Sequence, residues 1–185
     1  MEAETKARLT SASPTSTPQP QGGSRAIKWN TLGDPVLRKM QQAAQEFMAD
    51  YRAGTLRWLT YYGSSGTGKT FLSSQVIQRL GGRVQSWPRF MAKMRTGDFR
   101  VYESVDNLAT FIRPLLLDEI GVGNDAKTFG LDLLLQVFDM RRSLPTIVTT
   151  NLTMAGLADI DARLASRLMR YGKVIECNTT DYSLR

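Results

Sequence analysis

The chain has 185 residues, of which 42% are hydrophobic and 22% are charged, and this composition is ordinary for a single globular domain. A formal charge of +7 favours an anionic partner such as a nucleic acid. The complete absence of His effectively excludes zinc chemistry, so catalysis must rest on carboxylates, Lys, Arg and a hard cation.

The sequence predicts a cytoplasmic protein. No apolar run is long enough to span a bilayer, and residues 1–9 are charged, unlike a secretory signal. Cys177 is the only cysteine, so no internal disulfide can form and a reducing compartment fits. Membrane partners are therefore not expected.

Residues 1–33 are rich in Ser, Thr, Pro, Gln and Gly, and they contain few large apolar side chains. Such a segment cannot bury enough surface to offset the entropy of ordering, so we expect a flexible tail followed by one domain over residues 34–185. The first nine residues could form a short docking helix on a partner. A free tail is the alternative.

A helix is expected directly after this tail. Asp34 is a suitable N-cap, Pro35 suits the first helical position and Gly54 follows the expected end, while apolar residues recur between them at helical spacing. A strand over residues 57–62 comes next.

This strand leads into a full match to the pattern G-x-x-x-x-G-K-[ST], made by Gly63, Ser64, Ser65, Gly66, Thr67, Gly68, Lys69 and Thr70. The glycines let backbone N–H groups surround a polyphosphate, and the following helix directs its positive end at the same anion. Lys69 would bind the β and γ phosphates, and Thr70 would bind Mg²⁺. Phe71, the next residue in the chain, is also expected to bind the nucleotide.

The next segments are a helix that ends at Gly81 and Gly82, a strand over residues 83–87 and two helical segments over residues 88–97 and 98–113. The two helical segments mix aromatic and basic side chains. Their basic residues are either merely solvated or part of a nucleic-acid-contacting face, and spacing does not separate these interpretations.

Two carboxylates, Asp118 and Glu119, end the apolar strand over residues 115–119. Parallel strands place ligands at their carboxyl ends, where the phosphate-binding loop also lies, so we expect the two motifs to meet. Asp118 would hold Mg²⁺, and Glu119 would polarise the attacking water. A strand over residues 146–151 ends at Asn151, which would orient that water or sense the γ phosphate.

Helices over residues 126–142 and 159–170 and a strand over residues 173–177 complete the chain. Alternating strands and helices predict an α/β fold with a parallel sheet covered on both faces. The helix over residues 159–170 carries Arg163, Arg167 and Arg170, which could simply form a solvated face.

These motifs resemble those of AAA+ ATPases of the DnaC/IstB group over residues 34–185. The resemblance is carried by the phosphate-binding loop, by the Walker B strand ending at Glu119, and by residues 145–152, which are similar to the group's sensor 1 strand. It implies a P-loop NTPase three-layer sandwich with little or no C-terminal lid domain. The cofactors implied are ATP and Mg²⁺.

The resemblance also assigns roles further along the chain. Residues 163–168 are similar to the Box VII segment, so Arg167 would be an arginine finger that reaches the ATP of a neighbouring subunit, with Arg163 and Arg170 as alternatives. The terminal residues Asp181-Tyr-Ser-Leu-Arg185 are similar to a sensor 2 segment, although the group commonly reads Ser-Tyr-Arg. The region of residues 89–113 would contact single-stranded DNA through Phe90, Lys93, Arg95, Phe99 and Arg100.

The function implied is that of an ATP-dependent helicase loader, which binds single-stranded DNA and a replicative DNA helicase as a homo-oligomer and uses hydrolysis for release. Larger loaders of the group carry a folded N-terminal domain, whereas about 33 residues precede the expected ATPase domain here. Either the tail docks on the helicase or the partner differs. The alternatives are a transposition accessory ATPase that binds duplex DNA and recruits a transposase, and a nucleotide-gated adaptor that scarcely hydrolyses ATP.

Overall fold

The computed structural model describes residues 33–55, 57–96, 100–121 and 129–179, without the side chains of residues 100–104 and 129. Residues 1–32 of the expected tail therefore lie outside the described residues. No described helix is long and apolar enough to cross a membrane.

The molecule is built on a parallel sheet of five strands in the order β2-β3-β4-β1-β5. The strands are β1 (Trp58–Tyr62), β2 (Arg83–Ser86), β3 (Leu115–Asp118), β4 (Thr146–Thr150) and β5 (Gly172–Glu176). The predicted α/β class and parallel sheet are confirmed. Because β4 lies between β1 and β3, the carboxyl ends of these three strands are neighbours at one edge.

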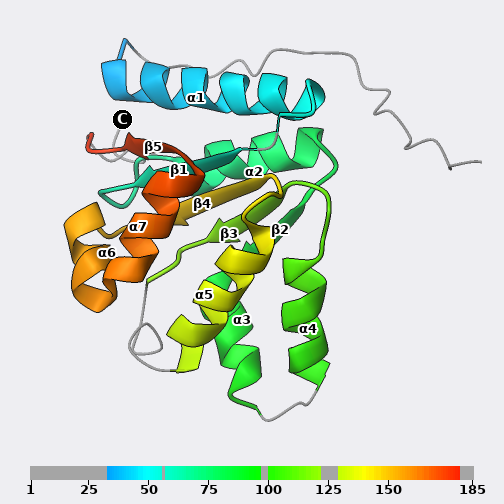
Figure 1. The fold of residues 1–185 in the computed structure, drawn as a ribbon. Helices are drawn as coiled ribbons and strands as arrows, with labels where there is room; N and C mark the ends of the chain where they lie inside the picture. The colour runs from blue at the N-terminus through cyan, green and yellow to red at the C-terminus, as the bar shows by residue number, and fades with distance from the viewer. Residues whose placement is uncertain (1–32, 56, 97–99, 122–128, 180–185) are drawn as a thin grey trace, which may run out of the picture.

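Helices cover both faces of this sheet and form the outer layers (Figure 1). The helices are α1 (Pro35–Arg52), α2 (Lys69–Arg79), α3 (Trp87–Met94), α4 (Arg100–Ala109), α5 (Phe129–Arg141), α6 (Met154–Ile160) and α7 (Ala162–Tyr171). Helices α1 and α2 pack on one face, and α3 to α7 belong to the opposite side.

The two hydrophobic clusters follow from the alternation of side chains along the strands. In β3, Leu116 packs with the apolar side chains of α1 and α2, whereas Leu115 and Leu117 belong to the cluster under α3, α4, α5 and α7. In β4, Ile147 and Val148 divide in the same way. A strand that is buried on both faces has consecutive apolar residues in its sequence. These strands could therefore be predicted clearly from the sequence.

Helix α1 begins as the sequence predicted and is tied to the strand that precedes the phosphate-binding loop. Asp34 caps it, with Oδ1 accepting from the N–H groups of Val36 at 2.7 Å and Leu37 at 3.3 Å. The buried Tyr61 hydroxyl of β1 donates to the carbonyl of Met40 at 2.6 Å. Helix α1 is thereby fixed against β1.

Three predicted boundaries were wrong, and local capping explains the main one. Trp87 begins α3 instead of ending β2, and residues 110–113 follow α4 instead of belonging to it. The predicted helix over residues 159–170 corresponds to α7, and its first two residues belong to the end of a separate helix, α6, which was not predicted. The side chains of Thr153 and Asp161 cap them, and the extended backbone of Asp161 separates them.

A buried arginine joins the last turn of α5 to the segment after α4 and to the start of β4. Arg141 is fully buried, and burial lowers its pKa to about 10, so it stays charged at neutral pH. Its guanidinium donates to Thr146 Oγ1 and to the carbonyls of Leu108, Phe111, Arg113 and Pro145, at 2.7–3.4 Å. The planar fork with five donors suits this ring of acceptors.

We expect Arg141→Met to destabilise the domain by about 3 kcal/mol or more, because several buried carbonyls lose their donor. For a domain of this size that is roughly 6–12 °C in the melting temperature, measurable by circular dichroism. Its exposed neighbour gives the matched control, Arg142→Met, which should change the melting temperature little. Equal melting temperatures for the two variants would contradict the role assigned to Arg141.

Candidate functional site

The loop of residues 63–68 joins the end of β1 to the start of α2, and its three glycines, Gly63, Gly66 and Gly68, all have positive φ. Gly68 is the N-cap of α2 and has φ of 83°, in the left-handed region. Gly63 has φ of 114°, and a Cβ there would lie 2.5 Å from Asn178 Oδ1. Only glycine therefore allows the end of β5 to approach the loop this closely.

Lys69 lies inside this loop and is largely buried. Its Nζ donates to the carbonyls of Gly63 at 2.9 Å and Ser64 at 2.5 Å. Burial lowers the pKa of Lys69, whereas the nearby charges of Asp118 and Glu119 raise it. The lysine therefore completes the loop from within, next to two acids.

Asp118, at the end of β3, is the junction between the loop helix and β4. Its Oδ1 accepts from the hydroxyl of Thr70 at 2.8 Å and from that of Thr149 at 2.5 Å. Asp118 is 7% exposed, so these hydroxyls satisfy a buried carboxylate. The predicted meeting of Thr70 and Asp118 is confirmed by this contact.

Glu119 follows directly and has an unusual backbone. It has φ of 60°, and among the described residues it is the one non-glycine with positive φ. Its N–H donates to Thr149 Oγ1 at 3.0 Å, which helps to hold the left-handed conformation. Such conformations cost free energy and cluster at functional sites, and this one places an exposed carboxylate after a buried strand.

A cavity of about 620 Å³ brings these groups together at the carboxyl edge of the sheet. Its lining residues are Ser65, Gly66, Thr67, Gly68, Lys69, Thr70, Phe71, Ser74, Glu119 and Asn151. The predicted loop, Glu119 and Asn151 therefore face one space. Its volume lies in the range of ordinary ligand sites.

Two residues of this region were not predicted from the sequence. Thr149 binds Asp118 and Glu119, and the amide oxygen of Asn178 accepts from the N–H of Ser64 at 3.1 Å. Asn178 follows β5 as Asn151 follows β4, so a polar amide after a strand was the available signal. Thr149 gave no signal, because its partners come from a strand 31 residues away.

The residues at the end of β3 fit a magnesium ion. Mg²⁺ prefers oxygen ligands and is usually held by one or two carboxylates, substrate phosphates and water. The hydroxyl of Thr70 and the carboxylate of Asp118 provide such oxygens at one place. No cluster of three or more acidic, Cys or His ligands occurs among the described residues, so a metal held by protein groups alone is not indicated there.

The candidate DNA residues divide into three groups. Phe90 is 4% exposed and stacks on Trp87 in the core with ring centroids 5.2 Å apart, so the prediction that Phe90 stacks on bases was wrong. Lys93 and Arg95 are exposed at the end of α3. Phe99, the side chain of Arg100 and all of Arg185 lie outside the described residues.

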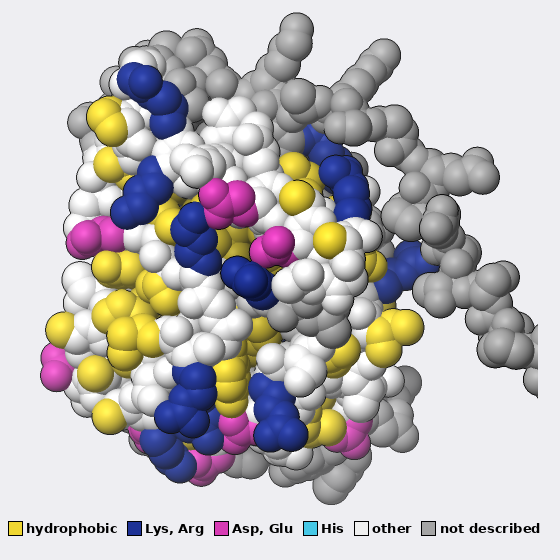
Figure 2. All heavy atoms as spheres, turned by 45° about the horizontal axis from the view of Figure 1, so that its top comes forward, with side chains coloured by type: hydrophobic (Ala, Val, Ile, Leu, Met, Phe, Trp, Pro, Cys, Tyr) yellow, Lys and Arg dark blue, Asp and Glu magenta, His cyan; other side chains and the backbone are white. Residues whose placement is uncertain are grey.

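Basic side chains are spread over the surface. Figure 2 shows Lys and Arg in several separate groups on the face seen from the side of α1, with Asp and Glu between some of them. The visible face therefore carries no single continuous basic stripe. The net charge alone does not outline a path for a nucleic acid.

The three arginines of α7 lie in different surroundings. Arg167 forms a two-pronged ion pair with Asp139 of α5. Arg163 pairs with Asp161, the N-cap of its own helix. Arg170 lines a second cavity at the amino-terminal edge of the sheet.

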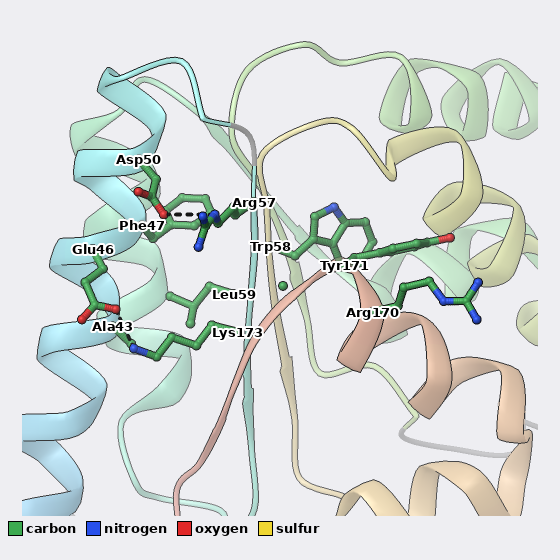
Figure 3. A pocket seen from close by; sticks show the side chains of 11 residues that line it. Ala43, Glu46, Phe47, Asp50, Arg57, Trp58, Leu59, Arg170, Tyr171 and Lys173 are labelled. Carbon is green, nitrogen blue, oxygen red and sulfur yellow. Dashed lines mark hydrogen bonds and ion pairs between the residues drawn. The ribbon is translucent and has the colours of Figure 1, made fainter.

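This second cavity, of about 560 Å³, lies between α1, the start of β1 and the end of α7 (Figure 3). Its rim carries the ion pairs Glu46–Lys173 at 2.5 Å and Asp50–Arg57 at 3.7 Å. The phosphate-binding loop lies at the other end of β1, so this cavity is separate from the candidate site.

No protein-family model and no curated protein sequence matches the chain. Solved structures do match in fold. A crystal structure of DnaI has 23% identity and a TM-score of 0.68, and it covers 81% of this chain and 86% of that one. The crystal structure of the DnaC helicase loader has 17% identity and a TM-score of 0.64, covering 78% of this chain and 92% of that one.

DnaA from Aquifex aeolicus bound to AMPPCP is also similar, with 22% identity and a TM-score of 0.65, over 78% of this chain and 47% of that chain. These likenesses confirm the expected α/β fold with a parallel sheet: the chain shares the fold of these DnaI, DnaC and DnaA structures. Among the described residues there is no separate lid domain.

Because Thr149 bonds the carboxylate of Asp118 and the N–H of Glu119, we expect Thr149→Val to reduce any nucleotide turnover at this site by about 10- to 100-fold, the range for groups that orient the residues of a site. Thr149→Ser keeps the hydroxyl and should retain most activity. Phosphate release, compared at equal folded fraction, measures this difference. If the Val and Ser variants were equally active, the anchoring role would be wrong.

Proposed function

We propose that the chain is a Mg²⁺-dependent ATPase that acts as a DNA replication helicase loader. The observation that carries the ATPase part is the cavity in which the phosphate-binding loop, Glu119 and Asn151 face each other beside Asp118. A loop of this kind alone occurs in many nucleotide-binding proteins. The nearby carboxylates supply what hydrolysis needs in addition.

Each side chain has a task in this proposal. Lys69 exchanges its loop carbonyls for β- and γ-phosphate oxygens, while Thr70 and Asp118 hold the metal. Mg²⁺, when bound, neutralises charge on the phosphates. Glu119 accepts a proton from the attacking water, and Asn151 orients that water from the next strand. Most of the rate then comes from positioning and charge neutralisation.

Arg167 is proposed to complete the site of a neighbouring copy of the chain. Its helix ends at the amino-terminal edge of β5, and its guanidinium is held at the surface. An arginine supplied in trans makes hydrolysis depend on assembly, and such residues contribute about 10³- to 10⁵-fold in GTPases. The ATP-bound form is therefore an oligomer, and hydrolysis drives release.

The loader role is supported by the fold comparison. The DnaC structure is described as that of a helicase loader, and its chain is matched over 92% of its length. A similar DnaA structure is described as bound to AMPPCP and single-stranded DNA. The net charge of +7 and the exposed Lys93 and Arg95 on α3 fit a single-stranded DNA contact.

Other parts of the proposal rest on residues outside those described, apart from Gly33 and the backbone of Arg100. The tail of residues 1–33 is proposed to dock on the helicase, Arg185 to contact the nucleotide, and Phe99 and Arg100 to contact DNA. Deletion of residues 1–30 should then remove helicase binding while leaving ATP hydrolysis intact. Equal helicase binding without the tail would exclude it as the docking element.

The ATPase proposal predicts different defects for two substitutions. Lys69→Ala should abolish ATP binding, because the loop loses its phosphate contact. Glu119→Gln should still bind ATP but lose at least about 100-fold in turnover, because the general base is gone. Titration with a fluorescent ATP analogue and a phosphate-release assay separate the two effects. Normal turnover by Glu119→Gln would exclude Glu119 as the base.

The loader proposal predicts a preference for single-stranded DNA. The double substitution Lys93→Glu and Arg95→Glu should weaken binding of a labelled single strand. Each lost phosphate contact should reduce the slope of the logarithm of the binding constant against the logarithm of the salt concentration by about 0.7. The double substitution Arg38→Glu and Arg52→Glu makes the same charge change on α1, at the opposite face, and serves as control.

Stronger stimulation of ATPase activity by duplex DNA than by single strands would favour the transposition accessory ATPase instead. The absence of a co-purified replicative helicase would contradict the loader role as well. Both measurements leave the ATPase proposal standing, since nucleotide hydrolysis is assayed without either partner.

A further inference from the structure

The ion pair of Arg167 is part of a three-residue cluster between α5 and α7. Arg167 Nε donates to Asp139 Oδ1 at 2.6 Å, and Nη2 donates to Oδ2 at 2.8 Å. The hydroxyl of Tyr171 donates to the same Oδ1 at 3.0 Å. One carboxylate thus accepts three hydrogen bonds from the last two turns of α7.

The ion pair with Asp139 uses one edge of the Arg167 guanidinium and leaves a second edge for another ligand. A guanidinium can bind an oxyanion through its Nε–Nη2 edge or through its Nη1–Nη2 edge. Asp139 occupies the first edge. Within the described part of the chain, the one hydrogen bond of Nη1 is a long contact of 3.4 Å to the carbonyl of Arg163. Arg167 is therefore held by its Nε–Nη2 edge, while its Nη1–Nη2 edge is available to bind an oxyanion.

The cluster is anchored to the sheet through Tyr171. The ring of Tyr171 packs edge-on against Trp58 of β1, with centroids 5.1 Å apart. Trp58 also contacts Phe138 of α5 and donates through Nε1 to the carbonyl of Arg141 at 3.1 Å. Helices α5 and α7 are thereby locked together at the point where Asp139 meets Arg167.

Burial and charge indicate that Arg167 is held in place before any partner arrives. Its side chain is 24% exposed, so much of the rotamer entropy of a free arginine is already lost. The hydrogen bonds that Arg167 donates to Asp139 lower the pKa of Asp139 and raise the pKa of Arg167. Both groups are charged at neutral pH.

The other two arginines of α7 lack this arrangement. Arg163 uses its Nε and Nη2 on Asp161, the N-cap two residues before it, and its side chain is 58% exposed. Arg170 lines the cavity of Figure 3. Among the three, Arg167 is the one that a residue of another helix holds in a two-pronged contact.

We propose that Asp139 is a positioning residue for Arg167: it holds the Nε–Nη2 edge so that the other edge meets the γ phosphate of ATP bound to a second copy of this chain. The inference rests on the proposed ATPase function. Tyr171 supports the carboxylate. Asp139 touches neither ATP nor water in this arrangement, so its effect passes entirely through Arg167.

The test uses mixed assemblies in which one kind of subunit supplies the arginine and the other supplies the ATP site. A donor with Lys69→Ala binds no ATP but retains Arg167. An acceptor with Arg167→Ala retains its phosphate-binding loop. Each is expected to be nearly inactive alone, and mixing them should restore hydrolysis in the pairs whose shared site is complete.

Adding Asp139→Asn to the donor should lower kcat of the mixture by about tenfold with little change in KM for ATP, since the acceptor loop binds the nucleotide. The same substitution on the acceptor should cost far less, because that subunit supplies no arginine. Asp139→Glu on the donor should recover part of the activity. Asp132→Asn on the donor, at an exposed carboxylate 4.0 Å from Arg163, is the matched control.

The outcomes separate the two proposals. Equal losses from donor and acceptor, with a lowered melting temperature, would make Asp139 merely structural and overturn its positioning role. No loss from the donor would overturn it too. If wild-type chain hydrolyses ATP but the simple mixture does not, the in-trans arrangement fails while the ATPase stands. If wild-type chain neither binds nor hydrolyses ATP, the proposed function fails and this inference with it.

Discussion

One carboxylate oxygen holds the candidate site together. Oδ1 of Asp118 accepts hydrogen bonds from Thr70 of α2 and Thr149 of β4, so it joins three elements that are distant in sequence. This junction depends on the strand order, because β4 lies directly beside β3, and β1, whose loop leads into α2, is the next strand along. A buried carboxylate needs such partners, and here they are residues of the site itself.

Strand β1 connects the two regions that the proposed mechanism uses. Its last residue, Tyr62, leads into the phosphate-binding loop, and its first, Trp58, packs against Tyr171 in the cluster that holds Arg167. The five residues of β1 therefore separate the phosphate-binding loop from Arg167, the arginine proposed to act in a neighbouring site. Arg141, buried beside Trp58, also connects the end of α4 to β1: its carbonyl accepts from Trp58, and its guanidinium donates to Leu108.

Much of this molecule follows from local sequence signals, and the exceptions have clear physical causes. Doubly buried strands read as apolar runs, and Asp34, Pro35 and the glycine-rich loop act within a few residues, so they were predictable. Helix α6 was missed because a short helix has little periodicity. Phe90 was misassigned because an amphipathic pattern does not tell which aromatic residues pack inward. Thr149 and Asn178 act only through contacts across the sheet.

The internal hydrogen bonds of Lys69 bear on which ligands the loop accepts. Its ammonium group is already satisfied by the carbonyls of Gly63 and Ser64, in a largely buried position. A ligand that displaces these carbonyls must offer anionic oxygens at the same place, or the buried charge loses its partners at a substantial cost. Adenosine and AMP carry no β phosphate to do so. In the proposed nucleotide site, these hydrogen bonds of Lys69 would therefore favour di- and triphosphates over the bare nucleoside.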